Sequence, residues 1–268
     1  MPSSTIVPAP ALRCRARLAT GFANCVAARW ASPVAAAALL LAATLAPASA
    51  APAVAPDTLA QRLAACTACH ASKERSDAFF PRIAGKPAGY LYNQLLNFRE
   101  GRRQYPMMSY MVEHLPDAYL REIAQYFSAL HPPYPPARPG NAGAAVLERG
   151  RVLALQGDAA RNVPACVACH GQQLTGVEPA TPGLLGLPRD YINAQFGAWR
   201  NKVRRAHAPD CMAAVASRLS DADVAAVSAW LSSQNVPADA RPAASLAQPA
   251  PLECGSASGT PFKTGGQP

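Results

Sequence analysis

The chain has 268 residues, of which half are hydrophobic and 15% are charged, and its formal net charge is +9. Residues 1–50 hold four of the 25 basic residues and none of the 16 acidic ones, so the rest of the chain has only a modest basic excess. This balance does not predict nucleic-acid binding, and the composition does not predict a protein with many membrane spans.

The first fifty residues have the pattern of a secretory signal peptide. Four arginines precede an apolar run over residues 34–45, and small residues follow up to Ala50. A basic segment, a short apolar run and small residues are the three parts of such a signal. We therefore predict that residues 1–50 are a signal peptide cleaved near Ala50. An uncleaved anchor is the alternative, although the apolar run is short for a membrane span.

A Cys-x-x-Cys-His motif occurs twice, as CTACH ending at His70 and as CVACH ending at His170. Two thiols about one helical turn apart can add to the two vinyl groups on one porphyrin edge, and the next residue's imidazole then points at the iron. The motifs therefore predict two covalently attached haem c groups. The predicted attachment residues are Cys66, Cys69, Cys166 and Cys169, and His70 and His170 are the predicted iron ligands.

Two other chemistries use the Cys-x-x-Cys spacing. A zinc site would combine both pairs as four thiolates, which leaves no role for His70 and His170. A thioredoxin-like redox pair is expected in a βαβ setting, which the sequence does not show. Haem attachment accounts for the histidines and for the duplication, so it is the favoured interpretation.

Apolar residues at helical spacing predict helices over residues 59–68, 87–101 and 117–130. In the second half, Ser220 is a suitable N-cap with Asp223 at the N3 position, and apolar residues follow at the same spacing. No segment has a convincing strand pattern. We therefore predict an all-α protein. Each helical unit is too small to form a large hydrophobic core from its own side chains, so a bound group is expected at its centre.

The duplication extends well beyond the two motifs. The matched pairs include Pro81 with Pro182, Gly85 with Gly186, Tyr90 with Tyr191, Gln94 with Gln195, Phe98 with Trp199, Leu115 with Leu219 and Tyr126 with Trp230. We predict a first domain over residues 51–131, a proline-rich linker over 132–143, a second domain over 144–236 and an irregular tail over 237–268.

The repeat also selects the methionines that occupy equivalent places. Met108 lies seven residues before Leu115, and Met212 lies seven residues before Leu219. We predict both as the second axial ligands of the two irons, with the adjacent Met107 as the alternative to Met108. A thioether ligand favours ferrous iron and leaves no open position for a substrate.

Other residues have predicted supporting roles. The carbonyls of Pro81 and Pro182 are candidates to accept a hydrogen bond from Nδ1 of the ligand histidines. Cys211 and Cys254 are an even pair in an exported protein, so a disulfide is predicted. The basic run over residues 200–205 is either a docking patch or a solvated helix face. The remaining histidines, His114, His131 and His207, are expected at the surface, with His207 the substitute ligand if Met212 does not bind.

These features together resemble the class I cytochromes c, and specifically the two-domain cytochrome c4 family. The resemblance covers about residues 57–235 and is carried by both CH motifs, by PRIAG with YLYNQL, and by the segments around Met108 and Met212. It implies two tandem all-helical domains, each built around one covalent haem and packed about a pseudo-twofold axis. It also implies a periplasmic electron carrier whose partners are redox proteins, including a membrane-bound oxidase or reductase, with no small-molecule substrate. The segment that follows the first motif departs from the family pattern.

Three functions are compatible with two haems. Electron transfer between respiratory components is the leading prediction, and it makes the chain a carrier rather than an enzyme. The cytochrome subunit of a dehydrogenase, such as one oxidising sulfur compounds or alcohols, is the alternative. A two-haem peroxidase is the third, and the matched methionines argue against it because that reaction needs an open iron position.

Overall fold

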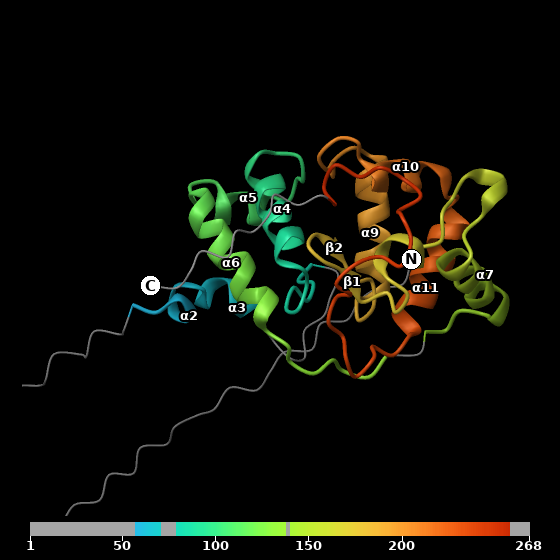
Figure 1. Cartoon of the computed structure of the whole chain (residues 1–268), viewed down its shortest axis with the longest axis horizontal. Helices are drawn as coiled ribbons and strands as arrows, with labels where there is room; N and C mark the ends of the chain where they lie inside the picture. Colours follow the sequence, from blue (N-terminus) through green and yellow to red (C-terminus); the bar gives the residue numbers. More distant parts are fainter. Residues whose placement is uncertain (1–56, 71–78, 138–139, 258–268) are drawn as a thin grey trace, which may run out of the picture. The chain divides into compact units, whose positions relative to one another are not determined.

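The computed structural model describes residues 57–70, 79–137 and 140–257. The predicted signal peptide and the segment after the first CH motif lie outside the described residues. The first half of the described chain is helical (Figure 1). Its elements are α2 (Leu59–Arg62), α3 (Ala64–His70), α4 (Ala88–Arg99), α5 (Pro106–Val112) and α6 (Asp117–Ala129).

The second half repeats this arrangement with a longer first helix. Its elements are α7 (Ala144–Leu155), the 3-10 turn η2 (Ala159–Arg161), α8 (Val167–His170), β1 (Gly176–Val177), β2 (Thr181–Pro182), α9 (Arg189–Arg200), α10 (Cys211–Arg218) and α11 (Asp221–Ser233). The two strands pair antiparallel, with Gly176 opposite Pro182. Among the described residues, no helix is long and apolar enough to cross a membrane.

The predicted helices are confirmed, except that the segment 59–68 forms two short helices, α2 and α3, on either side of Leu63. Helices α4 and α6 occupy the predicted ranges, and α11 begins with the predicted capping box, in which the Ser220 side chain accepts from Asp223 N. The sequence predicted no strand, whereas the structure contains the β1–β2 hairpin. Each strand has only two residues, which is too short to show an alternating pattern.

Each half has its own buried apolar cluster. In the first half, Leu63, Leu120 and Phe127 are almost completely buried between the helices. In the second half, Leu153, Val227 and Leu231 are almost completely buried in the same way. The half-buried side chains at the edge of each cluster include one cysteine of the CH motif and one methionine, so each core adjoins one candidate haem site.

Residues that are equivalent in the repeat meet each other between the two halves. Arg103 and Arg204 form an antiparallel bridge, and Gln104 N donates to Val203 O while Arg205 N donates to Arg102 O. The two hydrogen bonds that flank the bridge are equivalent in the repeat, as expected when the two halves are related by a twofold axis. Helix α4 also contacts β2, as Figure 1 shows.

Beyond α11 the chain continues as a segment without helix, drawn in red in Figure 1. Ala243 pairs with the β1 strand, because its N donates to Gly176 O and its O accepts from Glu178 N. Further on, Cys254 forms the predicted disulfide with Cys211 at the start of α10. The tail is therefore fixed to the second half at two places.

Candidate haem sites

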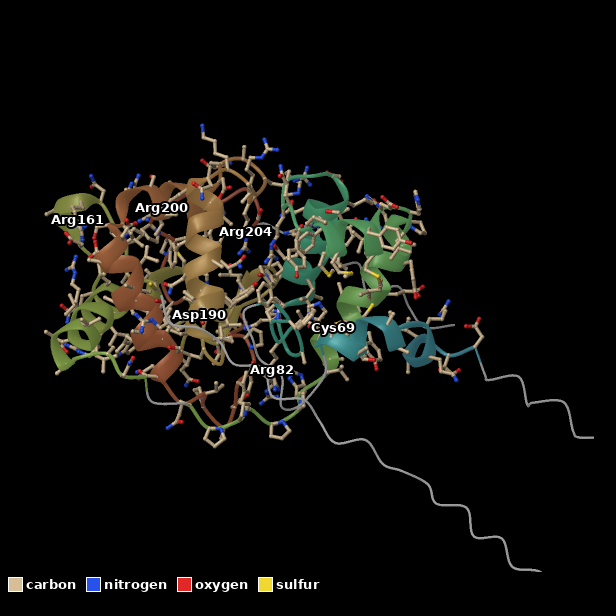
Figure 2. All side chains as sticks on the ribbon, turned by 180° about the vertical axis from the view of Figure 1, so that it is seen from behind. Cys69, Arg82, Arg161, Asp190, Arg200 and Arg204 are labelled. Carbon is tan, nitrogen blue, oxygen red and sulfur yellow. A yellow bond between two sulfur atoms is a disulfide. The ribbon has the colours of Figure 1, made fainter. Side chains whose placement is uncertain are left out.

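The cysteines of the first motif are on the short helix α3. Cys66 and Cys69 are three residues apart on this helix, and both are free and half-buried. Figure 2 labels Cys69 on this segment. Burial raises the pKa of the Cys66 thiol. The site therefore presents two free thiols about one helical turn apart, which is the spacing that thioether formation to one porphyrin edge requires.

The cysteines of the second motif lie at the start of α8. Cys166 is the N-cap of this helix and Cys169 is within it, and both are free. Burial raises the pKa of Cys166 to about 12. Across the described ranges, no three His, Cys, Asp or Glu side chains are grouped to hold a metal ion, so the four-thiolate zinc alternative has no site there.

Both ligand-candidate histidines are oriented by the predicted proline carbonyls. His70 Nδ1 lies 2.9 Å from Pro81 O, and His170 Nδ1 lies 2.7 Å from Pro182 O. A carbonyl oxygen only accepts, so each Nδ1 donates its proton and each Nε2 keeps a free lone pair. Burial lowers the pKa of both imidazoles, which keeps them neutral. Each histidine is therefore in the protonation state in which it can bind iron.

The structure separates the two adjacent methionines of the first half. Met107 is 60% exposed, whereas Met108 packs against the first apolar cluster, as Cys66 does. Met212 and Cys166 both pack against the second cluster in the same way. Met111 is 36% exposed. The matched methionines thus adjoin the same clusters as the matched cysteines.

Two buried side-chain nitrogen atoms in the second half, Arg189 Nε and Trp199 Nε1, have no hydrogen-bond partner in the described part of the chain. The indole Nε1 of Trp199 is buried without a hydrogen bond, and the guanidinium of Arg204 stacks 3.9 Å from its ring. A buried donor without an acceptor is costly, so it indicates an acceptor that the polypeptide does not supply. The haem's carboxylates are acceptors of this kind, so the donor set at this site fits a covalently bound haem.

A cluster of repeated polar residues lies between the two halves. Arg103 donates to Gln94, Tyr191 and Gln195, and Arg204 donates to Gln195, Gln94 and Tyr90. Arg204 follows the end of α9, on the side that faces the first half (Figure 2). Its burial and the neighbouring Arg103 lower its pKa. Sequence reasoning matched the tyrosines and glutamines of the repeat but missed this cluster, although the aligned Arg103 and Arg204 were a signal for it.

The basic run over residues 200–205 is divided between buried and exposed side chains. Arg200 donates to Ala216 O and Leu219 O and pairs with Asp221, and Arg204 is in the buried cluster. Lys202 and Arg205 are exposed. Two of the four basic side chains are therefore held inside the protein, and a docking role for the other two stays a prediction. Of the other histidines, His114 is exposed, and His207 Nε2 lies 3.3 Å from Arg102 Nη2.

The tail also contacts residues beside the second methionine and in the first half. Gly255 N donates to Pro209 O, and the Ser256 hydroxyl accepts from His207 N. On the other side, Asn93 of α4 donates to Ser256 O. The disulfide therefore holds the tail at the residue next to Met212 in sequence, and the tail also reaches the first half.

Comparisons with known proteins agree with this geometry. Residues 148–235 match the cytochrome c family. The chain is 40% identical to a thiosulfate dehydrogenase electron acceptor from Thiomonas intermedia, over 64% of this chain and 79% of that protein. It is 30% identical to a cytochrome c4 from Pseudomonas aeruginosa, over 63% of this chain and 84% of that protein. The crystal structure of reduced recombinant cytochrome c4 from Pseudomonas stutzeri superposes with a TM-score of 0.56 at 28% identity, covering 65% of this chain and 95% of that one.

The helical fold and its Cys-x-x-Cys-His sites define a class I c-type cytochrome, which binds haem c covalently and transfers electrons. Its partners are other redox proteins, and the chain is a carrier rather than a catalyst. Among such cytochromes, the chain belongs to the cytochrome c4 family.

Proposed function

We propose that this chain is a periplasmic electron carrier with two covalent haems, one in each half. The haems are attached at Cys66 and Cys69 and at Cys166 and Cys169. The observation that carries this proposal is that each half orients its own histidine through a proline carbonyl, His70 at 2.9 Å and His170 at 2.7 Å. A single haem would leave one of these two oriented imidazoles without a purpose.

The chain's own groups determine what the bound haems can do. A haem bound at each site would supply one-electron oxidation and reduction. His70 and Met108 would hold the first iron and His170 and Met212 the second, so protein groups would leave no position open on either iron. The neutral thioether favours ferrous iron and raises the reduction potential relative to harder ligands. With no open position, the sites exclude oxygen, peroxide and substrates, which disfavours the peroxidase alternative.

The partners we propose are a reductase or dehydrogenase as donor and a terminal oxidase as acceptor. The higher identity to a thiosulfate dehydrogenase electron acceptor, 40% against 30% for cytochrome c4, favours a periplasmic dehydrogenase as the donor. The second candidate function is therefore the cytochrome subunit of such a dehydrogenase. The two are distinguished by whether the protein purified from cells carries a dehydrogenase with it or is isolated alone and reduced by a separately added one.

The ligand assignment is tested by the absorption spectrum and by a covalent-haem assay. We expect two haems per chain and a weak far-red band of the ferric protein, which reports methionine-to-iron bonds. Met108→Leu and Met212→Leu should each remove about half of this band, and each should lower the potential of one haem by a substantial part of the roughly 0.8 V range that axial ligands span. Met107→Leu is the matched control, because its side chain is 60% exposed, and should change neither property.

Three results would overturn the proposal. They are a single haem per chain, high-spin ferric iron in the untreated protein, or ready binding of carbon monoxide by the ferrous protein at neutral pH. If Met107→Leu removes the band and Met108→Leu does not, the two-haem carrier stands but the ligand of the first iron is the other methionine. The export step is tested separately, by the N-terminal residue of the mature protein, which we expect directly after Ala50.

A further inference from the structure

A buried lysine of the first half lies against the second candidate haem site. Lys86, just before the α4 helix, is only 6% exposed, and its Nζ donates to Gly183 O at 2.7 Å. Within the described residues no carboxylate forms an ion pair or a hydrogen bond with it. Burial, assisted by the nearby Arg82, lowers the pKa of Lys86 to about 8, so the ammonium still carries most of its charge at pH 7. A buried cation without a counter-ion is costly and needs a reason.

The residue that accepts from Lys86 is next to the one that orients His170. Gly183 directly follows Pro182, whose carbonyl accepts from His170 Nδ1. This segment is firmly held, because Pro182 pairs with Gly176 in the hairpin and Leu184 N donates to Leu174 O. A Cβ at Gly183 would overlap the backbone of Thr175. The ammonium group is therefore fixed one peptide unit from the carbonyl that orients the histidine.

A second contact keeps the lysine in this place. Gly89 N, in the first turn of α4, donates to Pro179 O at 3.0 Å. A Cβ at Gly89 would lie 2.6 Å from the same oxygen, so the helix and the loop are in close contact. The start of α4 is thus attached to the loop over residues 179–183 at both Lys86 and Gly89. Lys86 cannot move away from the second site without breaking this contact between the halves.

The repeat shows that the arrangement is one-sided. Gly85 matches Gly186 and Pro87 matches Pro188, so Lys86 matches Leu187. Leu187 is apolar and packs against the cluster of its own half. The second half therefore presents no cation from this position towards His70.

We propose that Lys86 of the first half raises the reduction potential of the second haem and so directs electrons towards it. Ferric iron carries one more positive charge than ferrous iron, and a fixed cation in a site of low dielectric constant disfavours the extra charge. One electron then moves from the iron held by His70 to the iron held by His170, oxidising the first and reducing the second, with no proton required. This inference rests on the proposed function, because it takes His170 as the ligand of the second iron.

The test compares Lys86→Met with Lys86→Arg in the full-length protein with both haems attached. Potentiometric titration at pH 7 gives the two potentials, and the haems are identified by the signals that Met108→Leu and Met212→Leu remove. Lys86→Met should shift the electron equilibrium between the haems about tenfold towards the first, which is about 59 mV for a one-electron couple. Lys86→Arg keeps the charge and should retain most of the wild-type difference. Lys202→Met, which removes an exposed lysine of the second half, should leave both potentials unchanged.

Unchanged potentials in Lys86→Met, with native circular dichroism and a native far-red band, would overturn the proposal and leave the two-haem carrier intact. Equal shifts of both haems would overturn it as well, because the effect would then not be specific to the second site. Loss of the second haem's band in Lys86→Met and Lys86→Arg alike would also reject it, since the lysine would then hold the site together rather than set its potential. A wild-type protein without two methionine-ligated haems would instead reject the proposed function. Lys86→Gln serves as the second neutral variant if the methionine variant does not accumulate.

Discussion

The two methionine-bearing helices occupy equivalent places in the repeat, yet their surroundings differ. Helix α5 begins without a side-chain cap, and Met107 and Tyr110 are exposed along it at 60% and 73%. Helix α10 is capped by Asp210, whose side chain accepts from Ala213 N, and a disulfide at Cys211 ties it to the tail. The methionines that pack on each core are the same in the two halves, whereas the caps and segments that hold each of these helices in place differ. The second half has acquired supports that the first half lacks, and the predictions below test how much each of them contributes.

The largest effect is expected from removing the disulfide. The double change Cys211→Ser with Cys254→Ser opens a link between cysteines 43 residues apart. The chain-entropy relation for a loop of this length gives about 4 kcal/mol, and we expect a loss of about 3 kcal/mol because the tail keeps its other contacts. Chemical denaturation followed by circular dichroism measures this loss. An unchanged free energy of unfolding would show that Ala243 and Ser256 hold the tail without the covalent link.

The next largest effect concerns the crossing of α7 and α11 in the second half. Gly150 of α7 packs directly on α11, where a Cβ would overlap the Ala226 carbonyl and lie 2.7 Å from Trp230 Cβ. In the first half, the short helices α2 and α3 pack through the fully buried Leu63 instead. Gly150→Ala should therefore destabilise the protein by about 3 kcal/mol, since no flexible atom can move away. A melting temperature equal to the wild type would mean that α7 shifts along α11 at little cost.

A smaller loss is expected from the ion-pair network at the start of α11. Asp223 is 5% exposed and accepts from Arg149 at 2.9 Å, from Arg161 at 2.6 Å and from the Ser220 hydroxyl. In the first half, the matching residue is Tyr119 and the helix has no side-chain cap. Asp223→Asn removes the charge from this network and should cost about 2 kcal/mol at pH 7.

The same network predicts a dependence on pH with a definite sign. Arg161 above all holds the pKa of Asp223 well below its ordinary value of 3.8. The stabilisation is therefore complete above that ordinary value and is lost as the pH falls below it, towards the folded-state pKa. The difference between wild type and Asp223→Asn should shrink between pH 5 and pH 2 as measured by urea unfolding. Asp190→Asn, at an exposed carboxylate, is the control, and a difference as large at pH 2 as at pH 5 would contradict the assignment.

Local features of the fold and of the sites could be predicted from sequence. The spacing of Pro81 and Pro182 after the two motifs predicted the histidine contacts, and register within the repeat favoured Met108, the methionine that packs on the core. The histidine contacts are confirmed because they depend on residues close in the chain, whereas the role of Met108 as a ligand stays a prediction that rests on the duplicated pattern. The cap at Ser220 is local in the same sense.

Contacts between distant segments could not be predicted in this way. Nothing in the sequence near Lys86 indicates that its ammonium group reaches Gly183, 97 residues later. The close packing of Gly150 on α11 likewise depends on how two helices cross, which helical periodicity does not determine. The Arg103–Arg204 cluster forms only where the two halves pack together. Alignment of the repeat identifies these two residues as equivalent, but it does not show that they touch.

The smallest expected effect is a gain in stability. It comes from a second glycine-to-alanine substitution, which has the opposite sign to Gly150→Ala. Gly197 lies within α9, and a Cβ there meets nothing within 4 Å in the described structure. Its equivalent in the first half, Leu96, packs against the first cluster. Gly197→Ala should stabilise the protein by about 1 kcal/mol through helix propensity alone, which is roughly 2–4 °C in melting temperature for a protein of this size. Leu96→Ala should have the opposite sign, because it removes packing without restricting the backbone further. If Gly197→Ala lowers the melting temperature instead, the space beside α9 is filled in the haem-bound protein. Position 197 would then be as closely packed as Leu96 is in the first half.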